Sequence, residues 1–496
     1  MKKAIVIGSG FSGMSTAAFL AKQGLQVTVL EKHNIPGGRA RQVKADGFTF
    51  DMGPSWYWMP DVFEKFFEQF GKQVSDYYTL DRLSPSYTVY FRDERIDIPS
   101  DYNALKQLFE QLETGSSIKL DKFLKEAAFK YQVGIKDLVY KPGQSVTEFL
   151  NFDFLKGVFR LDVFTSIESH INKFFKNKKI RQLLAFPVLF LGALPSQTPA
   201  LYSLMNYADI KLGTWYPKGG MFKIVEAMHG LCNQLGVKFI FNANVDNMIF
   251  DKNNIALVES HHIEDNSTTS YEADVVIGAA DYQFIETKLL PAYLRTYSED
   301  YWDSRVMAPS CLIYYVGLNK KLVNITHHSL FFDVSFDKHG EQIYTKPAWP
   351  DEPLFYVSAT SVTDKSVAPF NAENLFFLIP VASGLTGDSE ALREKYFNMI
   401  VERYEKHIGQ KIKSSIVYKK SFGPTDFVND YNAFRGNAYG LANTLKQTAI
   451  LKPSLKSKKV NNLFYTGQLT VPGPGVPPAI ISGEVVANEV GKYLNK

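Results

Sequence analysis

The sequence predicts an α/β fold, and three features carry that prediction. An apolar strand, a helix and a second strand follow one another at the start of the chain, which is the order of a β-α-β unit. Glycines cluster in the turn between the first strand and the helix. A further strand and helix end the chain, beyond a long stretch rich in aromatic residues. We therefore expect one α/β domain built from both chain ends, with a mixed α+β domain inserted into it.

The N-terminal part alternates strand and helix patterns before it becomes mainly helical. Short β-branched runs bounded by turn residues predict strands, and apolar residues at three- and four-residue spacing predict helices. Strands are expected at 2–7 and 27–30, helices at 13–23, 61–72 and 101–113, and a hairpin at 87–91 and 95–98. From 119 to 212 the pattern is mainly helical and rich in Phe and Leu.

The C-terminal part returns to mixed strands and helices. Helices are expected at 222–235, 389–407 and 478–493, strands at 237–241, 247–250, 255–259, 274–278 and 463–466, and a proline-rich loop at 346–353. These patterns divide the chain into five segments. The segments 1–75, 213–290 and 421–496 are expected to form the α/β domain, 76–212 a helical substrate region, and 291–420 the sheet of the substrate domain.

The composition excludes several classes of protein. With 45% hydrophobic and 21% charged residues, the 496-residue chain is expected to be globular. Its 55 Lys and Arg nearly balance 51 Asp and Glu, which argues against a nucleic-acid partner. Cys232 and Cys311 are expected to be lone buried thiols, and no Cys/His cluster has the spacing of a metal site. We therefore predict neither a metal nor a disulfide framework.

Neither a secretory signal nor a membrane-spanning helix is predicted. Gly8 and Gly10 interrupt the apolar start of the chain, and no small-residue cleavage site follows. The longest apolar run, 183–194, is broken by Pro187 and Gly192, and it is shorter than the about 20 residues that span a bilayer. We expect a cytoplasmic protein that can still lie on a membrane surface.

The turn after the first strand has the dinucleotide-binding pattern G-x-G-x-x-G, formed by Gly8, Gly10 and Gly13. The first glycine permits the tight turn, the second lets a pyrophosphate approach the backbone, and the third lets the helix pack closely on the strand. The N-terminus of that helix supplies free N–H groups for phosphates. Glu31 ends the second strand, where an acid hydrogen-bonds a ribose and repels a 2′-phosphate.

A second glycine pair follows this acid, in the stretch Gly37-Gly38-Arg39. Paired glycines let the loop fold back over the cofactor, so that Arg39 can reach the pyrophosphate or the flavin side. Dehydrogenases that use NAD do not generally need this element. The sequence therefore favours FAD over NAD.

With these motifs the chain resembles the FAD-dependent carotenoid desaturases of bacteria and fungi, of the phytoene desaturase type, within the wider group of amine-oxidase-like flavoproteins. The resemblance covers nearly the whole chain and rests on the extended fingerprint 8–39, on 47–54, on 215–221 and on 465–483. It implies a Rossmann-type FAD-binding domain, an inserted mixed α+β substrate domain and a helical membrane-facing region.

The resemblance also implies which residues hold FAD. The stretch 50–54 should pass the isoalloxazine, Val245 should contact the adenine through its backbone, and the helix beginning near Val476 should point its N-terminus at the flavin. Gln468 stands where many flavoproteins carry an acid. The cofactor-binding residues that we expect are Gly8, Gly10, Phe11, Ser12, Gly13, Glu31, Lys32, Gly38, Arg39, Gly53, Pro54, Ser55, Val245, Gly467, Gln468, Gly475, Val476 and Pro477.

Residues 146–194 combine Phe and Leu with a group of cations at 173–181. Composition alone favours an ordinary core helix with a solvated basic face. Cations beside an exposed apolar helix also suit an anionic lipid surface. The resemblance implies this second interpretation, peripheral membrane association, because the implied substrate is a linear carotenoid dissolved in the bilayer.

The resemblance implies a reaction in which two hydrogens leave a CH₂–CH₂ unit beside a polyene. The flavin N5 accepts a hydride, and the neighbouring carbon loses a proton. No set of residues for nucleophilic catalysis is evident, and the reaction requires none. We name Glu148, Asp51 and Arg435 as acid/base candidates, and expect the flavin and the shape of the cavity to carry the chemistry. The final electron acceptor is expected to be oxygen or quinone.

The predicted function is desaturation of phytoene or a related linear carotene. A 1-hydroxycarotenoid 3,4-desaturase and a diapophytoene (C30) desaturase are the alternatives, and they differ from it in tunnel length and in one or two polar side chains at the end of the tunnel. More distant alternatives are a carotenoid isomerase and a non-catalytic lipid-binding flavoprotein. Motifs do not distinguish among the desaturases.

Overall fold

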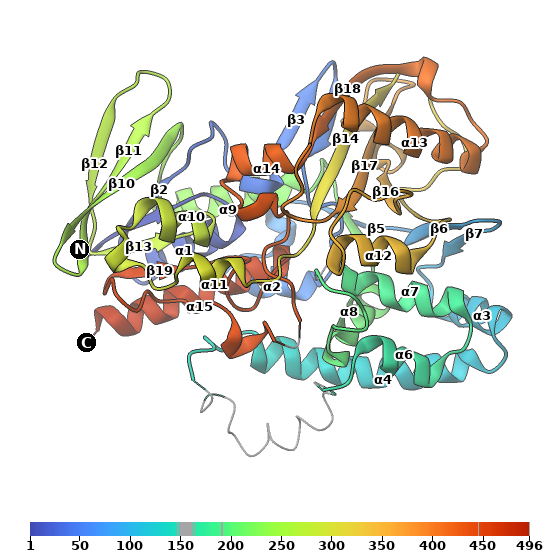
Figure 1. Cartoon of the computed structure of the whole chain (residues 1–496), viewed down its shortest axis with the longest axis horizontal. Helices are drawn as coiled ribbons and strands as arrows, with labels where there is room; N and C mark the ends of the chain where they lie inside the picture. The colour runs from blue at the N-terminus through green and yellow to red at the C-terminus, as the bar shows by residue number, and fades with distance from the viewer. Residues whose placement is uncertain (146–147, 149–161, 163, 190–191, 445, 496) are drawn as a thin grey trace.

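A computed structural model describes residues 1–145, 148, 162, 164–189, 192–444 and 446–495. Figure 1 shows two regions built on sheets, side by side along the longest axis, and a group of helices beneath the second region. Both chain ends lie in the first region, so this region is assembled from distant parts of the sequence.

The first region is built on a parallel sheet with the strand order β19-β13-β1-β2-β9. Strand β1 lies in the middle and pairs with β2 on one side and β13 on the other. The place after β1 is therefore the switch point at which ligands bind in open α/β sheets. The strands are β1 (Lys3–Ile7), β2 (Gln26–Leu30), β9 (Lys238–Ile240), β13 (Val275–Gly278) and β19 (Leu463–Tyr465).

Strand β1 is buried on both faces because its apolar residues run without a polar interruption. Ala4 and Val6 pack into the core cluster that also contains helix α1, while Ile5 and Ile7 pack into the cluster on the opposite face. On the first face, α1 (Phe11–Lys22) contacts both α9 (Phe222–Gln234) and α15 (Val476–Leu494).

An antiparallel sheet covers the opposite face of the parallel sheet. It has the order β10-β11-β12, and residues such as Val245 and Val258 reach the cluster that holds Ile5 and Ile7. Strand β10 runs over Ala243–Asp251, β11 over Asn254–His262 and β12 over Thr268–Glu272. The first region thus has three layers, namely helices, parallel sheet and antiparallel sheet.

The second region is built on a sheet with the order β18-β14-β17-β16-β15-β6-β7, in which only β15 and β6 run parallel. One face packs on helix α13 (Glu390–Ile408). The other face turns toward the first region. The strands are β6 (Tyr87–Phe91), β7 (Arg95–Ile98), β14 (Ser310–Leu318), β15 (His328–Phe332), β16 (Phe355–Ser358), β17 (Glu373–Val381) and β18 (Ile416–Phe422).

A group of helices packs beneath this sheet (Figure 1). Its helices are α3 (Tyr102–Leu112), α4 (Ser116–Val133), α6 (Ile167–Phe174), α7 (Lys178–Leu189) and α8 (Leu204–Tyr207). Within the part of the chain that the structure describes, no helix combines the length and apolar character needed to cross a membrane. Membrane-facing helices remain a prediction, and most of 146–161 lies outside the described residues.

Short elements connect the two regions. Strands β3 (Gln42–Ala45) and β4 (Phe48–Asp51) form a hairpin, and β5 (Leu80–Arg82) pairs with β8 (Trp215–Pro217). The short helices are α2 (Pro60–Glu68), α10 (Tyr282–Phe284), α11 (Glu299–Asp303), α12 (Phe336–Tyr344) and α14 (Pro424–Tyr431).

The predicted hairpin at 87–91 and 95–98 is confirmed, and it joins the sheet of the second region rather than the helices that follow it. Cys232 and Cys311 are both free and buried, as predicted. The sequence patterns missed β12, because its residues Thr268–Glu272 are polar and largely exposed, and they missed α12 and α14, which are short.

Candidate functional site: a two-part cavity between the regions

A cavity of about 380 Å³ lies at the carboxyl ends of the parallel strands. The residues that directly follow four of the strands all line it, namely Gly8 after β1, Glu31 after β2, Ala279 after β13 and Thr466 after β19. The cavity continues from there to the inner face of the second sheet. It therefore has two parts, a cofactor part at the parallel sheet and a substrate part at the second sheet.

The glycine-rich turn forms one wall of the cofactor part. Gly8 has a φ of 103°, a left-handed conformation that favours glycine. A Cβ on Gly13 would lie 2.1 Å from the Gly8 carbonyl oxygen, so Gly13 lets α1 pack against the turn and does not itself line the cavity. A Cβ on Gly10 would have no neighbour within 4 Å. The free space at Gly10 is the space that a pyrophosphate needs.

The start of α1 offers backbone donors to the same space. Gly10 is the N-cap, and no side chain caps the helix. Phe11 and Ser12 follow it and line the cavity. The first N–H groups of a helix lack intrahelical partners, so this end suits an anion.

Glu31 holds the turn in place. Its carboxylate is buried and accepts hydrogen bonds from the backbone N–H of Ser9 at 2.8 Å and from the Ser9 hydroxyl at 2.6 Å. The second carboxylate oxygen accepts from the backbone N–H of His33 at 3.0 Å. Lys32 also lines the cavity and donates to the Asn429 carbonyl at 2.8 Å. Glu31 thus organises the loop as well as offering a carboxylate to a ribose.

Arg39 places a buried positive charge on the cavity wall. Burial lowers the pKa of its guanidinium, an effect that Asp281 opposes. Its Nη2 donates to the Asn437 carbonyl at 3.2 Å, whereas Nε has no hydrogen-bond partner among the described residues. A buried donor without a partner is costly, so this atom fits a cavity that receives an acceptor.

The end of the β3–β4 hairpin packs on the same loop. A Cβ on Gly53 would lie 2.5 Å from the Arg39 carbonyl oxygen, so this close approach requires glycine. Gly38, Pro54 and Ser55 line the cavity beside it. Val245 of β10 also lines the cavity. Strand β10 lies beside Glu31, because the backbone N–H of Ala243 donates to the Glu31 carbonyl at 2.9 Å.

The C-terminal motif closes the cofactor part. The backbone N–H of Gly467 donates to the Ser482 hydroxyl at 3.0 Å, and the Gln468 amide donates to Asn437 Oδ1 at 3.0 Å. Helix α15 begins at Val476 with proline in its first turn and no side-chain cap. Gly467, Gln468, Gly475, Val476 and Pro477 all line the cavity, so the positive end of the α15 dipole faces it.

These features fit FAD. The free space at Gly10, the unpartnered Nε of Arg39 and the uncapped start of α1 provide room and donors for a pyrophosphate. The start of α15, where Pro477 and Pro478 have no N–H, offers mainly its positive dipole end to an electron-rich ring. Of the predicted cofactor-binding residues, the structure gathers all except Gly13 around one cavity.

The substrate part is mainly apolar and aromatic. Residues from β14, β16, β17 and the segment after β4 meet there, although they are far apart in the sequence. The walls include Trp56, Trp58, Met59, Met205, Cys311, Ile313, Tyr356, Leu378 and Tyr439. No local motif announces these residues. Every second side chain of a strand points to the same face of the sheet. This alternation is the sequence signal that limits which strand residues can line the cavity.

Asp281 is a cavity residue that sequence analysis missed although a signal was available. It follows β13 by three residues, at the edge where parallel strands end. Its carboxylate accepts from the backbone N–H groups of Phe284 and Phe434 at 3.2 Å each. Burial raises its pKa and Arg39 lowers it, so the two side chains are electrostatically coupled across the wall.

The structure places none of the three acid/base candidates on the cavity wall. Asp51 accepts hydrogen bonds from the backbone N–H groups of Met221 at 2.7 Å and Phe222 at 3.0 Å, at the start of α9, and burial raises its pKa to about 6. Its geometry is that of a helix cap.

Glu148 and Arg435 are likewise engaged elsewhere. The Glu148 carboxylate accepts from the backbone N–H groups of Gly143, Gln144 and Ser145 within 3.0 Å. Arg435 is 36% exposed and pairs with Asp303 at 2.8 Å. Both side chains stabilise local loops, so neither is placed to exchange a proton with a ligand in the cavity.

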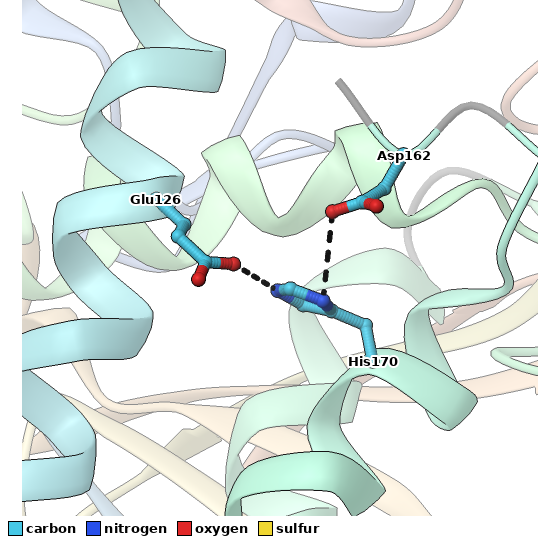
Figure 2. Close-up of side chains that lie close together, drawn as sticks. All are labelled: Glu126, Asp162 and His170. Atoms are coloured by element: carbon cyan, nitrogen blue, oxygen red, sulfur yellow. Dashed lines mark ion pairs between the residues drawn. The ribbon is translucent and has the colours of Figure 1, made fainter. Parts of the chain in front are cut away.

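A second polar cluster lies in the helical group, away from the cavity. Figure 2 shows Glu126 of α4 and Asp162 on either side of His170 of α6, at 3.5 and 3.8 Å. These three side chains have the types and spacing of a metal site. However, the buried Lys130 ammonium donates to Asp162 at 3.0 Å and lies 3.5 Å from His170 Nε2. Lys130 already supplies a cation to this cluster, which ties α4 to α6.

Comparison with known proteins matches residues 11–491 to the family described as flavin containing amine oxidoreductase. The chain is 39% identical to a carotenoid 3,4-desaturase of Haloarcula japonica, over 97% of this chain and 96% of that protein. It is 30% identical to a zeta-carotene-forming phytoene desaturase of Myxococcus xanthus, over 99% and 94%. Among solved structures, an oxidoreductase from Methanosarcina mazei is similar with a TM-score of 0.62 and 16% identity, covering 98% of this chain and 100% of that one.

Proposed function

Because this chain belongs to the family of flavin-containing amine oxidoreductases, we infer that it is an FAD-dependent carotenoid desaturase. The reaction removes two hydrogens from neighbouring carbons and leaves a C=C bond. Bound FAD supplies the hydride acceptor, and the second hydrogen leaves as a proton.

The observation that carries this proposal is the continuity of the cavity. The fingerprint residues Gly10 and Arg39 line the same space as Trp58, Ile313 and Leu378. A long hydrocarbon is recognised by shape and by removal of apolar surface from water, which such walls provide. An amine substrate would need polar or charged groups to receive it.

The residues of the chain have three tasks. They bind the cofactor, orient the substrate and exclude water from the reacting carbons. Gly8, Gly10 and the start of α1 would hold the pyrophosphate of bound FAD, and Arg39 and the start of α15 would stabilise negative charge on it. The aromatic walls position the substrate against the cofactor and keep water from the reacting carbons. An allylic cation is a strong acid, so its proton can pass to a weak acceptor on the cavity wall, such as a hydroxyl oxygen, and no carboxylate or histidine is required for this step.

Within the desaturases we propose a 3,4-desaturase as the finer function. The identity to the Haloarcula japonica protein, 39%, exceeds that to the Myxococcus xanthus phytoene desaturase, 30%, over similar shares of the chain. The phytoene and C30 desaturases remain the alternatives, and the length of the substrate part distinguishes them.

The test is a comparison of substrates. FAD-loaded protein is incubated with liposomes that contain phytoene, a C30 diapophytoene or a 1-hydroxylated carotenoid. We expect the hydroxylated carotenoid to gain one double bond, seen as a longer-wavelength absorption after chromatography, and to bleach the oxidised flavin under anaerobic conditions. Conversion of phytoene alone would assign the phytoene branch, and bound flavin that no polyene reduces would contradict the function.

We also propose that the protein works as a peripheral protein on the inner face of the cell membrane. Phe164, beside α6, is 87% exposed, and exposed lysines at 173, 176 and 178 follow it. An exposed apolar side chain, followed along the chain by exposed cations, suits an anionic lipid surface. Co-sedimentation with anionic liposomes that weakens with salt and with Phe164→Ser would support the proposal; equal binding to neutral liposomes would contradict it.

The electron acceptor is proposed to be oxygen or quinone. Quinones share the bilayer with the carotenoid, so both reach the protein from the same phase. Mixing anaerobically reduced protein with oxygen or with a quinone, and following the return of the oxidised flavin absorption, distinguishes the two.

A further inference from the structure

A hydroxyl group interrupts the apolar wall of the substrate part. Tyr356 of β16 lines the cavity, and its hydroxyl lies 2.6 Å from Nδ1 of His328. In the pairing of β15 with β16, His328 is opposite Ser358, two residues from Tyr356. Diagonal neighbours of this kind share one face of a sheet. The sheet itself therefore presents the tyrosine–histidine pair to the cavity side.

His328 is held in one position and one charge state. It is fully buried, and its ring stacks on Trp56 with centroids 4.1 Å apart and planes at 15°. Burial and the neighbouring His327 lower the pKa of His328 well below its ordinary value, so the ring is neutral. Its orientation is set by Trp56 and Tyr356.

The hydrogen bond has a preferred direction. His328 Nε2 has no hydrogen-bond partner among the described residues. A buried N–H without a partner is rarer in proteins than a buried acceptor without one. The tautomer that places the proton on Nδ1 is therefore favoured, and Nδ1–H donates to the Tyr356 oxygen. The Tyr356 hydroxyl hydrogen is then available to another acceptor.

This hydroxyl adjoins the cofactor part. Burial raises the pKa of Tyr356, and the hydroxyls of Ser358 and Ser55 both oppose this rise. Of these two serines, Ser55 also lines the cavity. The Ser55 hydroxyl donates to the Gly53 carbonyl at 3.2 Å, and Gly53 packs on the Arg39 backbone. The polar atoms thus lie where the two parts of the cavity meet.

A linear hydrocarbon has no atom that could use these groups. Phenylalanine would complete the apolar wall without burying a hydroxyl and an imidazole, and buried polar groups cost free energy unless they are hydrogen-bonded. A carotenoid with an oxygen near its end does offer such an atom. Desaturation at the 3,4 position takes place two carbons from C1, so a hydroxyl on C1 must sit close to the cofactor.

We propose that Tyr356 is a specificity residue that binds a hydroxyl group near the end of the carotenoid, and that His328 is its positioning residue. This proposal rests on the proposed function, carotenoid desaturation, and names its substrate class. The Tyr356 hydroxyl donates to the substrate oxygen, and the Ser55 hydroxyl lies beside it to accept in return.

The test compares Tyr356→Phe with Tyr315→Phe on the FAD-loaded protein. Tyr315 is also a fully buried tyrosine of the same sheet, but its hydroxyl donates to the Met52 carbonyl and does not line the cavity. We expect Tyr356→Phe to raise KM for a 1-hydroxylated carotenoid about tenfold or more, with kcat changed less, and to leave KM for the carotenoid without oxygen unchanged. Tyr315→Phe should change neither KM.

Binding without turnover gives a second readout. With the flavin reduced by dithionite, quenching of tryptophan fluorescence by the polyene reports affinity, because Trp56 and Trp58 line the cavity. Tyr356→Phe should weaken binding of the hydroxylated carotenoid by about the same factor as KM. His328→Asn, whose amide can still donate to Tyr356, should retain more affinity than His328→Leu.

The outcomes separate this inference from the proposed function. Wild-type protein that desaturates no carotenoid would contradict both. Wild-type protein that desaturates the hydroxylated carotenoid while Tyr356→Phe keeps the same KM and affinity would overturn the inference and leave the function standing. Equal losses for hydroxylated and plain carotenoids would also overturn it, because they would show a structural role.

Discussion

The two parts of the cavity are built on different principles. In the cofactor part, the groups offered to a ligand are mostly backbone atoms, held in place by glycines at 8, 10, 13 and 53 and by the ends of α1 and α15. In the substrate part they are side chains, carried on strands β14, β16 and β17 that are distant in sequence. One part depends on where the chain turns, and the other on which side chain stands at each strand position.

This difference has a consequence for substitution. A backbone-built site tolerates no added carbon where the chain approaches closely, but it is indifferent to most neighbouring side chains. A site built from side chains accepts apolar exchanges of similar volume and changes its selectivity instead. Relatives of one fold can therefore keep one cofactor while they act on different carotenoids.

Substitution of Gly13 should produce the largest effect. In Gly13→Ala the new Cβ would lie 2.1 Å from the Gly8 carbonyl oxygen, so α1 must move away from the turn. We expect FAD to be lost on gel filtration and the affinity of the apoprotein for FAD to fall by at least about a hundredfold, together with a lower melting temperature. Flavin fluorescence titration and thermal unfolding measure the two effects.

Gly10→Ala is the matched variant. Its Cβ meets nothing within 4 Å in the protein, so the melting temperature of the apoprotein should remain that of the wild type. FAD affinity should still fall, because the methyl group occupies the space for the pyrophosphate. If Gly10→Ala kept full FAD affinity, the cofactor part would not bind its ligand through this turn.

The same contrast explains what the sequence could and could not predict. The residues that line the cofactor part could be predicted because the backbone needs glycine there at a fixed spacing, and that spacing is visible in the sequence. Tyr356 and His328 were not, because they meet only through the pairing of β15 with β16. The motif that contains Asp51 predicts a position near the flavin. Its carboxylate instead accepts hydrogen bonds at the start of α9. The packing of the β3–β4 hairpin on α9 sets this orientation, and the local sequence does not reveal it.

Asp51 connects the β3–β4 hairpin to the start of α9, and its burial should make stability depend on pH. Its pKa is raised to about 6, mainly by burial, so between pH 4 and 6 the folded state holds a proton that the unfolded state has released. Stability should therefore fall as pH rises through this window, by up to about 3 kcal/mol. Urea unfolding of wild type and Asp51→Asn across pH 4–7 should show the variant gaining relative stability. A constant difference between the two would contradict the assignment.

A substitution at Lys130 tests whether the helical group can be destabilised without an effect on the cofactor part. Lys130→Met removes the buried ammonium and leaves Asp162, which is 28% exposed, without its partner. We expect the free energy of unfolding to fall by about 2 kcal/mol, below the full cost of breaking a buried pair because water reaches Asp162. Lys173→Met, an exposed lysine of α6, is the control. FAD affinity should stay unchanged in both variants, and a parallel loss of FAD would show that the two parts are not independent.

Arg435 should show the smallest effect, because it belongs to neither part of the cavity. Its side chain pairs with Asp303 at the surface, where an ion pair contributes at most about 1 kcal/mol. We expect Arg435→Gln to keep kcat/KM within about twofold and FAD affinity unchanged. A drop of tenfold or more in kcat, with FAD still bound, would mean that the loop of Arg435 moves to the reacting carbons during turnover. During turnover the substrate part would then include the loop of Arg435 in addition to the residues that line the cavity in this structure.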